Sequence, residues 1–212
     1  MRRTIYLSTF LLLSFVLWTL SVQWIDLASI GPQDSIVGFS TINGFFHRLT
    51  GVHLFLYQLT DWLSLIPLVF VLGFALLGLV QWVQRRSLFK VDRSLFILGG
   101  FYILVFLIFI FFEIYVINYR PILINGCLEA SYPSSTTLLF LCVMSTAVMQ
   151  LKHRLQNHCK VQCLSLLTVF TAVIVALRAI SGVHWITDII GGILLSTGLV
   201  TLYSYLIQKA DL

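Results

Sequence analysis

The sequence predicts an all-α integral membrane protein, one bundle of six transmembrane helices with an amphipathic extracytoplasmic segment. Hydrophobic residues make up 59% of the 212 residues and charged residues only 10%, which leaves too little polar surface to cover a water-soluble globule. The apolar residues also gather in long uncharged runs, and about 20 such residues cross a hydrocarbon core of roughly 30 Å. No repeat or long linker divides the chain, so residues 1–212 are expected to form a single domain.

Six runs are long enough for membrane spans. The fourth is short, although Ser134 and Ser135 can extend it. The first begins with Arg2 and Arg3, as a signal peptide does, but its apolar stretch exceeds the about 7 to 15 residues usual there, and we interpret it as a retained span. The runs are Thr4 to Gln23, Trp62 to Val83, Ser94 to Phe112, Thr136 to Gln150, Val161 to Leu177 and Ile189 to Ile207.

The lysines and arginines between the spans predict the orientation, because loops left in the cytoplasm are enriched in both. Ten fall on one side of the predicted membrane, and only Arg48, Arg120 and Arg178 fall on the other. We therefore expect a multi-pass protein of the cell membrane, with both termini cytoplasmic and the active site extracytoplasmic. The ten are Arg2, Arg3, Arg85, Arg86, Lys90, Arg93, Lys152, Arg154, Lys160 and Lys209.

Composition also limits the partners. The net charge of +5 fits this topology and an affinity for membrane lipids with anionic headgroups, rather than nucleic-acid binding. The four cysteines show no metal-ligand spacing with histidine, so the sequence implies no metal and no cofactor. No obligate protein partner is evident.

The longest outer loop, Ile25 to Asp61, contains apolar residues at helical spacing. The pattern predicts an amphipathic helix lying at the membrane interface. His47 and His53 are six residues apart, which does not place them on one helical face as a ligand pair. Either they have an interfacial role, or one of them leans over the active site. The apolar residues are Phe45, Phe46, Leu49, Val52, Phe55, Leu56 and Leu59.

The outer segment from Arg178 to Asp188 contains a histidine and an aspartate at positions i and i+4. His184 and Asp188 therefore lie on one face of a helix start. Asp188 can then accept a hydrogen bond from one imidazole nitrogen, which fixes the tautomer and leaves the other nitrogen as a nucleophile or base. The alternative is an interfacial pair that only satisfies its own hydrogen bonds.

A second outer segment, Glu113 to Ser135, ends in a helix start marked by Pro133 and Ser134. Such a start exposes backbone N–H groups and the positive end of the helix dipole, so it can bind an anion, although a plain N-cap at Ser134 fits equally well. Two arginines on the face where the charge rule disfavours them support the anion site, because guanidinium groups suit phosphate oxygens. The candidate phosphate ligands are Arg120, Ser134, Ser135, Thr136 and Arg178.

Together these segments resemble the type 2 phosphatidic acid phosphatase family, membrane relatives of the vanadium haloperoxidases. The family motifs are Lys-x6-Arg-Pro, Pro-Ser-Gly-His and Ser-Arg-x5-His-x3-Asp. The order, loop placement and spacings agree over Glu113 to Ile207, and the six-span topology agrees over the whole chain. The corresponding residues are Glu113-x6-Arg120-Pro121, Pro133-Ser134-Ser135-Thr136 and Leu177-Arg178-x5-His184-x3-Asp188.

The resemblance implies roles for these residues. His184 would attack phosphorus to form a phosphohistidine, and Asp188 would orient it. The two arginines and the amides at Ser134 and Ser135 would hold the phosphoryl oxygens.

Two departures bear on the substrate. Thr136 replaces the histidine that protonates the leaving oxygen in the family, a contribution of about 10²- to 10⁴-fold. A diphosphate needs that proton less, because its leaving group is a phosphate ester rather than an alkoxide. Glu113 replaces a lysine and could supply a carboxylic acid if its pKa is raised. The candidate substitutes for the missing acid are Glu113, Glu129, Tyr132, His47 and His53.

The sequence therefore predicts a lipid phosphatase that hydrolyses a lipid phosphate or prenyl diphosphate, with undecaprenyl diphosphate as the best single candidate. The alternative is a catalytically weakened relative that binds lipid phosphates as a sensor, scaffold or transport component. An unrelated six-span carrier would leave the clustered polar residues unexplained.

Overall fold

The computed structural model describes residues 2–155 and 157–210, which form helices joined by turns and loops. Long apolar stretches favour helices in lipid, because a helix satisfies its own backbone hydrogen bonds. The architecture confirms the predicted all-α membrane bundle. The elements are α1 (Arg2–Trp24), η1 (Pro32–Asp34), α2 (Ser40–Thr50), α3 (Leu54–Leu63), α4 (Leu65–Arg85), η2 (Leu88–Lys90), α5 (Arg93–Ile114), α6 (Ser135–Arg154), α7 (Asn157–Ile180) and α8 (Ile186–Ala210).

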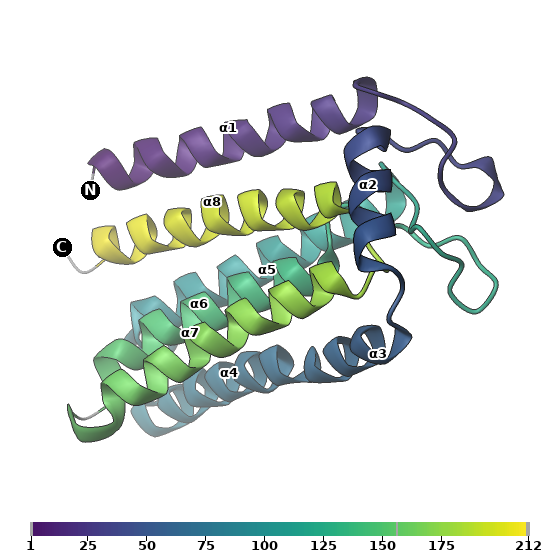
Figure 1. Ribbon diagram of the computed structural model, residues 1–212. Helices are drawn as coiled ribbons and strands as arrows, with labels where there is room; N and C mark the ends of the chain where they lie inside the picture. The colour runs from purple at the N-terminus through teal and green to yellow at the C-terminus, as the bar shows by residue number, and fades with distance from the viewer. Residues whose placement is uncertain (1, 156, 211–212) are drawn as a thin grey trace.

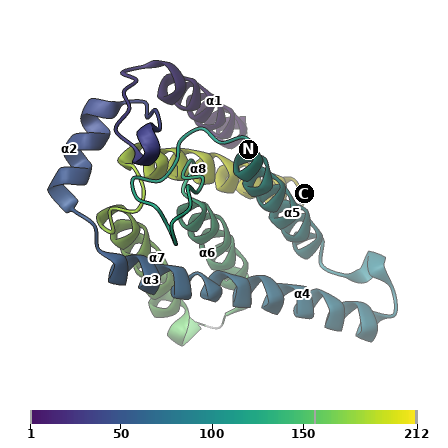
Figure 2. The same ribbon diagram turned by 90° about the vertical axis from the view of Figure 1, so that its right-hand side faces the viewer.

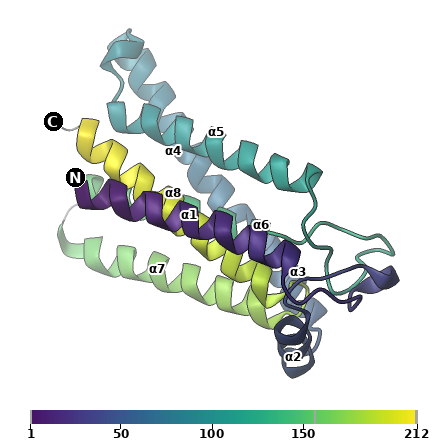
Figure 3. The ribbon, with the colours of Figure 1, turned by 90° about the horizontal axis from the view of Figure 1, so that it is seen from above.

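Six helical stretches of the described residues are long and apolar enough to cross a membrane, and they coincide with the six predicted spans. The second differs most, because α3 and α4 together form one 32-residue stretch, Leu54–Arg85. At about 1.5 Å per residue this stretch is longer than the hydrocarbon core is thick. Figures 2 and 3 show α4 tilted against the other spans, so that it diverges from α6 toward the η2 turn.

The predicted amphipathic segment is two helices rather than one. α2 ends at Thr50, and the chain turns at Gly51, whose φ of 66° is readily adopted by glycine. α3 then begins at Leu54 and continues toward the second span. The expectation of one interfacial helix is therefore wrong, because a single turn residue hardly disturbs the apolar periodicity that predicted it.

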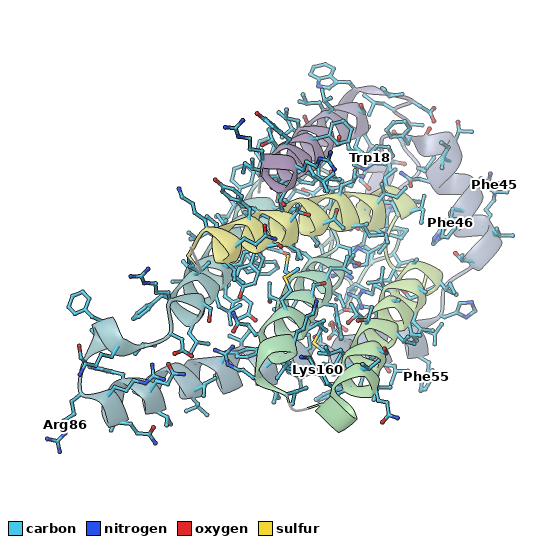
Figure 4. The ribbon with its side chains drawn as sticks, turned by 90° about the vertical axis from the view of Figure 1, so that its left-hand side faces the viewer. Trp18, Phe45, Phe46, Phe55, Arg86 and Lys160 are labelled. Atoms are coloured by element: carbon cyan, nitrogen blue, oxygen red, sulfur yellow. The ribbon has the colours of Figure 1, made fainter. Side chains whose placement is uncertain are left out.

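α2 runs across one end of the bundle (Figure 1). Its outer face carries Ile42, Phe45 and Leu49, which are all exposed, and Figure 4 shows Phe45 pointing away from the spans. On its inner face the amide of Asn43 donates to the hydroxyl of Thr187 at 3.0 Å. The helix thus has an apolar face suited to the lipid interface and a polar anchor on α8.

α8 lies at the centre of the bundle, with α1 and α6 packed along it. Glycines allow these close contacts. A Cβ on Gly191 would lie 2.6 Å from the ring of Tyr132, and a Cβ on Gly198 would lie 2.8 Å from Leu12. Small residues are typical of helix contacts in membranes, where close packing replaces the hydrophobic effect.

The two ends of the bundle differ in their connections. The start of α1, the end of α8 and the η2 turn lie at one end, which we call the turn end (Figure 1). The α1–α2 connection, the loop 115–134 between α5 and α6, and the connection 181–185 between α7 and α8 lie at the other, which we call the loop end (Figure 2). All the residues predicted to carry chemistry belong to the loop end.

Candidate active site

The loop 115–134 folds back on itself and is held against the start of α8. Tyr119 and Ala130 form an antiparallel bridge, and the backbone N–H of Arg120 donates to the carbonyl of Glu129 at 3.1 Å. The indole of Trp185 donates to the Tyr119 carbonyl at 2.8 Å. These bonds fix the position of Arg120 relative to the connection that carries His184.

The connection 181–185 is also tied to the turn between α2 and α3. The backbone N–H of His53 donates to the carbonyl of Ser181 at 2.9 Å. Gly182 has a φ of 67°, and a Cβ there would lie only 1.8 Å from the Gly51 carbonyl oxygen. Only glycine fits so close to another backbone, so this contact sets how near α3 lies to the site.

His184 is buried at the centre of these segments, with 3% of its surface exposed. Its Nδ1 lies 3.1 Å from the Ser131 hydroxyl and 3.2 Å from the Ser131 carbonyl oxygen. Its Nε2 faces Arg120, at 3.5 Å from Nη1. Burial lowers the pKa of His184 well below its ordinary value, and the positive charges of Arg178 and Arg120 lower it further. The imidazole is therefore neutral near pH 7.

Asp188 does not bond directly to His184, contrary to the expectation from their spacing. Its Oδ2 lies 3.9 Å from Nδ1, beyond a hydrogen bond. Oδ2 instead accepts bonds from the Ser131 hydroxyl at 2.5 Å and the Trp185 backbone N–H at 2.9 Å. The i and i+4 spacing places both side chains on one face, but the Ser131 hydroxyl occupies the space between them.

Two buried guanidiniums lie near one aromatic ring. The Cζ of Arg178 is 4.7 Å from the centre of the Tyr57 ring, and the Cζ of Arg120 is 5.6 Å from it. Arg178 also donates through Nη1 to the Thr60 hydroxyl at 3.1 Å and to the Tyr57 carbonyl at 3.3 Å. Cation–π contact with one ring partly offsets the repulsion between the two like charges.

Both arginines retain unused donors. In the described part of the chain the Nε atoms of Arg120 and Arg178 are buried without a hydrogen-bond partner. The carboxylate of Glu129 lies 3.1 Å from the Arg120 Nε, close enough for charge attraction but not aligned as a hydrogen bond. Buried donors without partners are costly, and an anion bound between the arginines would satisfy them.

The start of α6 differs in part from the expectation. The Ser134 hydroxyl accepts bonds from the Thr137 backbone and hydroxyl, so Ser134 is an N-cap. The backbone N–H of Ser134 donates to the Asp188 carbonyl at 3.1 Å. The expected bond from this amide to a phosphate is therefore wrong, because the amide joins α6 to α8. The amides of Ser135 and Thr136 belong to the first turn, where no intrahelical carbonyl is available.

An apolar cavity of about 540 Å³ lies beside this helix start, between α4, α5 and α6. Its polar lining comes from Asp61, Ser64, Ser135 and Thr136 at the loop end. The apolar lining continues between the spans. The lining residues there are Leu68, Val71, Tyr102, Ile103, Val105, Phe106, Phe109, Leu138, Leu139 and Val143. The shape suits a molecule with a polar head and a hydrocarbon chain.

The structure separates the candidate proton donors. His47 packs on Trp185 with ring centres 5.5 Å apart, His53 contacts the Thr50 carbonyl at 2.9 Å, and the Tyr132 hydroxyl bonds to Thr19. Glu129 instead contacts Arg120. Glu113 lines a narrow cleft together with Ser131 and Ser135. Glu129 thus contacts a predicted phosphate ligand, and Glu113 and Tyr132 line the same cleft as Ser135.

Sequence reasoning missed three residues at the site. Ser131 lies outside the motifs, Tyr57 belongs to a helix interpreted only by its amphipathicity, and Asp61 was taken as the end of a loop. Its position two residues before the Pro133-Ser134 motif is the signal that could have indicated Ser131. Tyr57 and Asp61 required the tertiary arrangement of α3.

Comparisons with known proteins agree with the fold. A family model described as PAP2 superfamily matches residues 98–211, more than half of the chain. No curated protein sequence matches. The crystal structure of a transmembrane PAP2-type phosphatidylglycerolphosphate phosphatase from Bacillus subtilis is similar, with a TM-score of 0.56 over 95% of this chain and 96% of that one. The sequence identity is 17%, so this likeness concerns the fold.

Proposed function

Because the chain belongs to the PAP2 superfamily, we propose that it hydrolyses a lipid phosphate or prenyl diphosphate through a phosphohistidine at His184. The observation that carries the proposal is the buried imidazole whose Nε2 lies 3.5 Å from a guanidinium nitrogen of Arg120. A nucleophile beside a buried cation is suited to attack a bound phosphoryl group.

The reaction has two steps. The Nε2 lone pair forms a bond to phosphorus while the bond from phosphorus to the leaving oxygen breaks, and that oxygen keeps the electron pair. Water then cleaves the N–P bond, releasing inorganic phosphate and restoring the imidazole. Arg120 and Arg178 stabilise the negative charge of the phosphoryl group during both steps.

The absence of a proton donor at Thr136 favours a diphosphate substrate. Thr136 stands at the wall of the cavity, where its hydroxyl cannot supply a proton near neutral pH. A prenyl monophosphate can leave without being protonated, whereas an alkoxide needs a proton to leave. Undecaprenyl diphosphate, which would give undecaprenyl phosphate and inorganic phosphate, is our best single candidate.

The cavity beside the start of α6 supports a lipid substrate. Its walls are apolar, and its polar end includes Ser135 and Thr136 at the start of α6. A hydrocarbon chain lying between α4 and α5 would leave its phosphate at the loop end.

We further propose that the loop end is extracytoplasmic in a cell membrane. The positive-inside rule supports this, because ten of the thirteen lysines and arginines fall on the opposite side of the predicted spans. Modification of Lys152 by an impermeant reagent added to intact cells would contradict this orientation.

The test is phosphate release by the detergent-solubilised protein, with prenyl diphosphate and phosphatidic acid supplied separately and a chelator present. We expect faster release from the diphosphate. Release from phosphatidic acid at an equal or higher rate would contradict the diphosphate preference, because another residue would then have to protonate the leaving group.

A second candidate function is binding without turnover. The Glu129 carboxylate beside Arg120 and the loss of the acid at Thr136 favour it. Retained binding of lipid phosphate with no release from either substrate would support a sensor, scaffold or transport component instead of an enzyme.

A further inference from the structure

Ser131 lies between the two residues that the family motif pairs directly. Its side chain is buried, with 2% of the residue exposed. Its hydroxyl contacts His184 Nδ1 at 3.1 Å and donates to Asp188 Oδ2 at 2.5 Å. The direct distance from Nδ1 to Oδ2 is 3.9 Å. The hydroxyl therefore bridges a gap that no direct hydrogen bond spans.

The surrounding groups determine which imidazole nitrogen carries the proton. The Ser131 carbonyl, 3.2 Å from Nδ1, can only accept, and the Ser131 hydroxyl uses its one proton toward Asp188. Both groups therefore present lone pairs to Nδ1, which must be protonated. On the other side, Arg120 has only donors to offer Nε2. Nε2 is thus unprotonated, and its lone pair accepts from Arg120 at 3.5 Å.

Asp188 is held by other donors as well. The Trp185 backbone N–H donates to Oδ2 at 2.9 Å, and the Asn118 amide donates to Oδ1 at 3.3 Å. Ser131 is itself fixed by its backbone N–H, which donates to the Asn118 carbonyl at 2.9 Å. Ser131 and Asp188 are thus parts of one rigid network, and His184 contacts that network through Ser131.

We propose that Ser131 is the positioning residue of this site: it connects Asp188 to His184 and holds the imidazole with Nδ1 protonated and with the unprotonated Nε2 facing the arginines. The inference rests on the proposed hydrolysis at His184. It assigns to Ser131 the contact that the family motif assigns to the aspartate alone.

Kinetics of Ser131→Ala test the role of the hydroxyl, because this variant keeps the backbone carbonyl. We expect kcat to fall about 10- to 100-fold, as is typical when a group that orients a metal-binding imidazole is removed, with KM and inhibition by inorganic phosphate nearly unchanged. Ser196→Ala is the matched control, since Ser196 is equally buried and its hydroxyl donates to the Gly192 carbonyl, away from His184. In protein that already carries Asp188→Ala, adding Ser131→Ala should lower kcat little further. Full kcat in Ser131→Ala would overturn the proposal, because Asp188 would then bond to Nδ1 directly.

A spectroscopic measurement separates this inference from the proposed function. In protein labelled with ¹⁵N-histidine, the His184 resonances are identified by their loss in His184→Ala. We expect the neutral tautomer protonated at Nδ1 in the wild type, and a changed Nδ1 resonance in Ser131→Ala, because the variant removes the hydroxyl contact to Nδ1. A wild-type imidazole protonated at Nε2, or one unchanged by Ser131→Ala, would overturn the assignment. If the wild type hydrolyses none of the lipids, the proposed function fails and the tautomer still decides the role of Ser131.

Discussion

Both ends of the bundle contain arginines, but the two ends pair them differently. At the turn end the carboxylate of Asp92 contacts Arg85 at 3.0 Å and Arg154 at 3.3 Å. It also accepts a bond from the Gln81 amide at 2.8 Å, while the Gln81 carbonyl accepts one from the Asp92 backbone. Positive and negative groups face one another, so this network needs no further partner.

At the loop end, two buried arginines have N–H groups without hydrogen-bond partners among residues 2–155 and 157–210. Arg178 is 1% exposed and Arg120 is 8% exposed, and within the described residues neither Nε has a hydrogen-bond partner. Tyr57 lies against both guanidiniums, while Glu129 reaches only Arg120 as an ion pair. This difference supports the proposal that the loop end receives an anion, because buried donors without partners cost stability in the empty site.

Loss of the nucleophile should give the largest effect. His184→Ala is expected to abolish phosphate release, because nothing else would form the covalent intermediate. The measurement is phosphate release from prenyl diphosphate, with Asp92→Asn at the turn end as the control. Turnover by His184→Ala above a trace would remove His184 from the mechanism and, with it, the functional distinction between the two ends.

Removal of one guanidinium should come next. Arg120→Ala is expected to lower kcat/KM about 10²- to 10³-fold, as loss of one preorganised donor to a developing charge typically does. Arg85→Ala removes an arginine of the turn end and should leave kcat/KM within about twofold, since its partner there is Asp92. Equal losses in the two variants would show that general destabilisation, rather than phosphate binding, explains the effect.

The pH dependence sharpens the electrostatic comparison. Burial and the charges of Arg178 and Arg120 lower the pKa of His184, so the imidazole should stay unprotonated below its ordinary value of about 6.5. The acid limb of kcat/KM against pH, which reports the free enzyme, should therefore lie below pH 6.5. In Arg120→Gln one cation is lost, so the limb should move up toward that value. An acid limb that stayed fixed in this variant would mean that another group titrates.

Restoring the family histidine should change selectivity more than rate. Thr136→His is expected to improve hydrolysis of phosphate monoesters more than of diphosphates, because monoesters need a protonated leaving group. Thr136→Ala should cost little, since it removes at most a hydroxyl worth about 0.5 to 1.5 kcal/mol. Rates on phosphatidic acid and prenyl diphosphate are compared for each variant. An equal gain on both substrates would argue against proton donation as the reason.

The smallest effect is expected at the turn end. Asp92→Asn should leave kcat unchanged and lower stability only slightly, because ion pairs this exposed contribute about 0.2 to 1 kcal/mol each. The bond from Gln81 lowers the pKa of Asp92, helped by Arg85 and Arg154. The stability difference should therefore be present at neutral pH and vanish as acid protonates the wild-type carboxylate. Thermal unfolding of both proteins in detergent at several pH values measures it.

The sequence predicted most of the fold, because six apolar runs in a chain with few charges leave little choice but a membrane bundle. It did not predict the break at Gly51, since one residue with positive φ leaves the apolar periodicity intact. Nor did it predict the continuation of α3 toward the second span. Both features depend on how the turn packs against Ser181 and Gly182.

For the site, spacing correctly placed Arg120 and His184 near one another but could not specify the bonds between them. Ser131 reaches His184 and Asp188 only because the loop 115–134 folds back onto the α7–α8 connection. The sequence predicted a free amide at Ser134, because this residue stands at a helix start. In the structure this amide donates to the backbone carbonyl of Asp188 in α8. Such long-range bonds leave no periodic signal.

The cavity beside α6 determines how much of a lipid chain the protein can contact. The cavity of about 540 Å³ is partly open rather than closed around its contents, so it can lie against a substrate tail without enclosing all of it. On the proposed function, the protein would therefore contact the head and the first isoprene units, while the rest of the tail stayed among the lipids. Chain length beyond that point would affect partitioning into the bilayer rather than recognition.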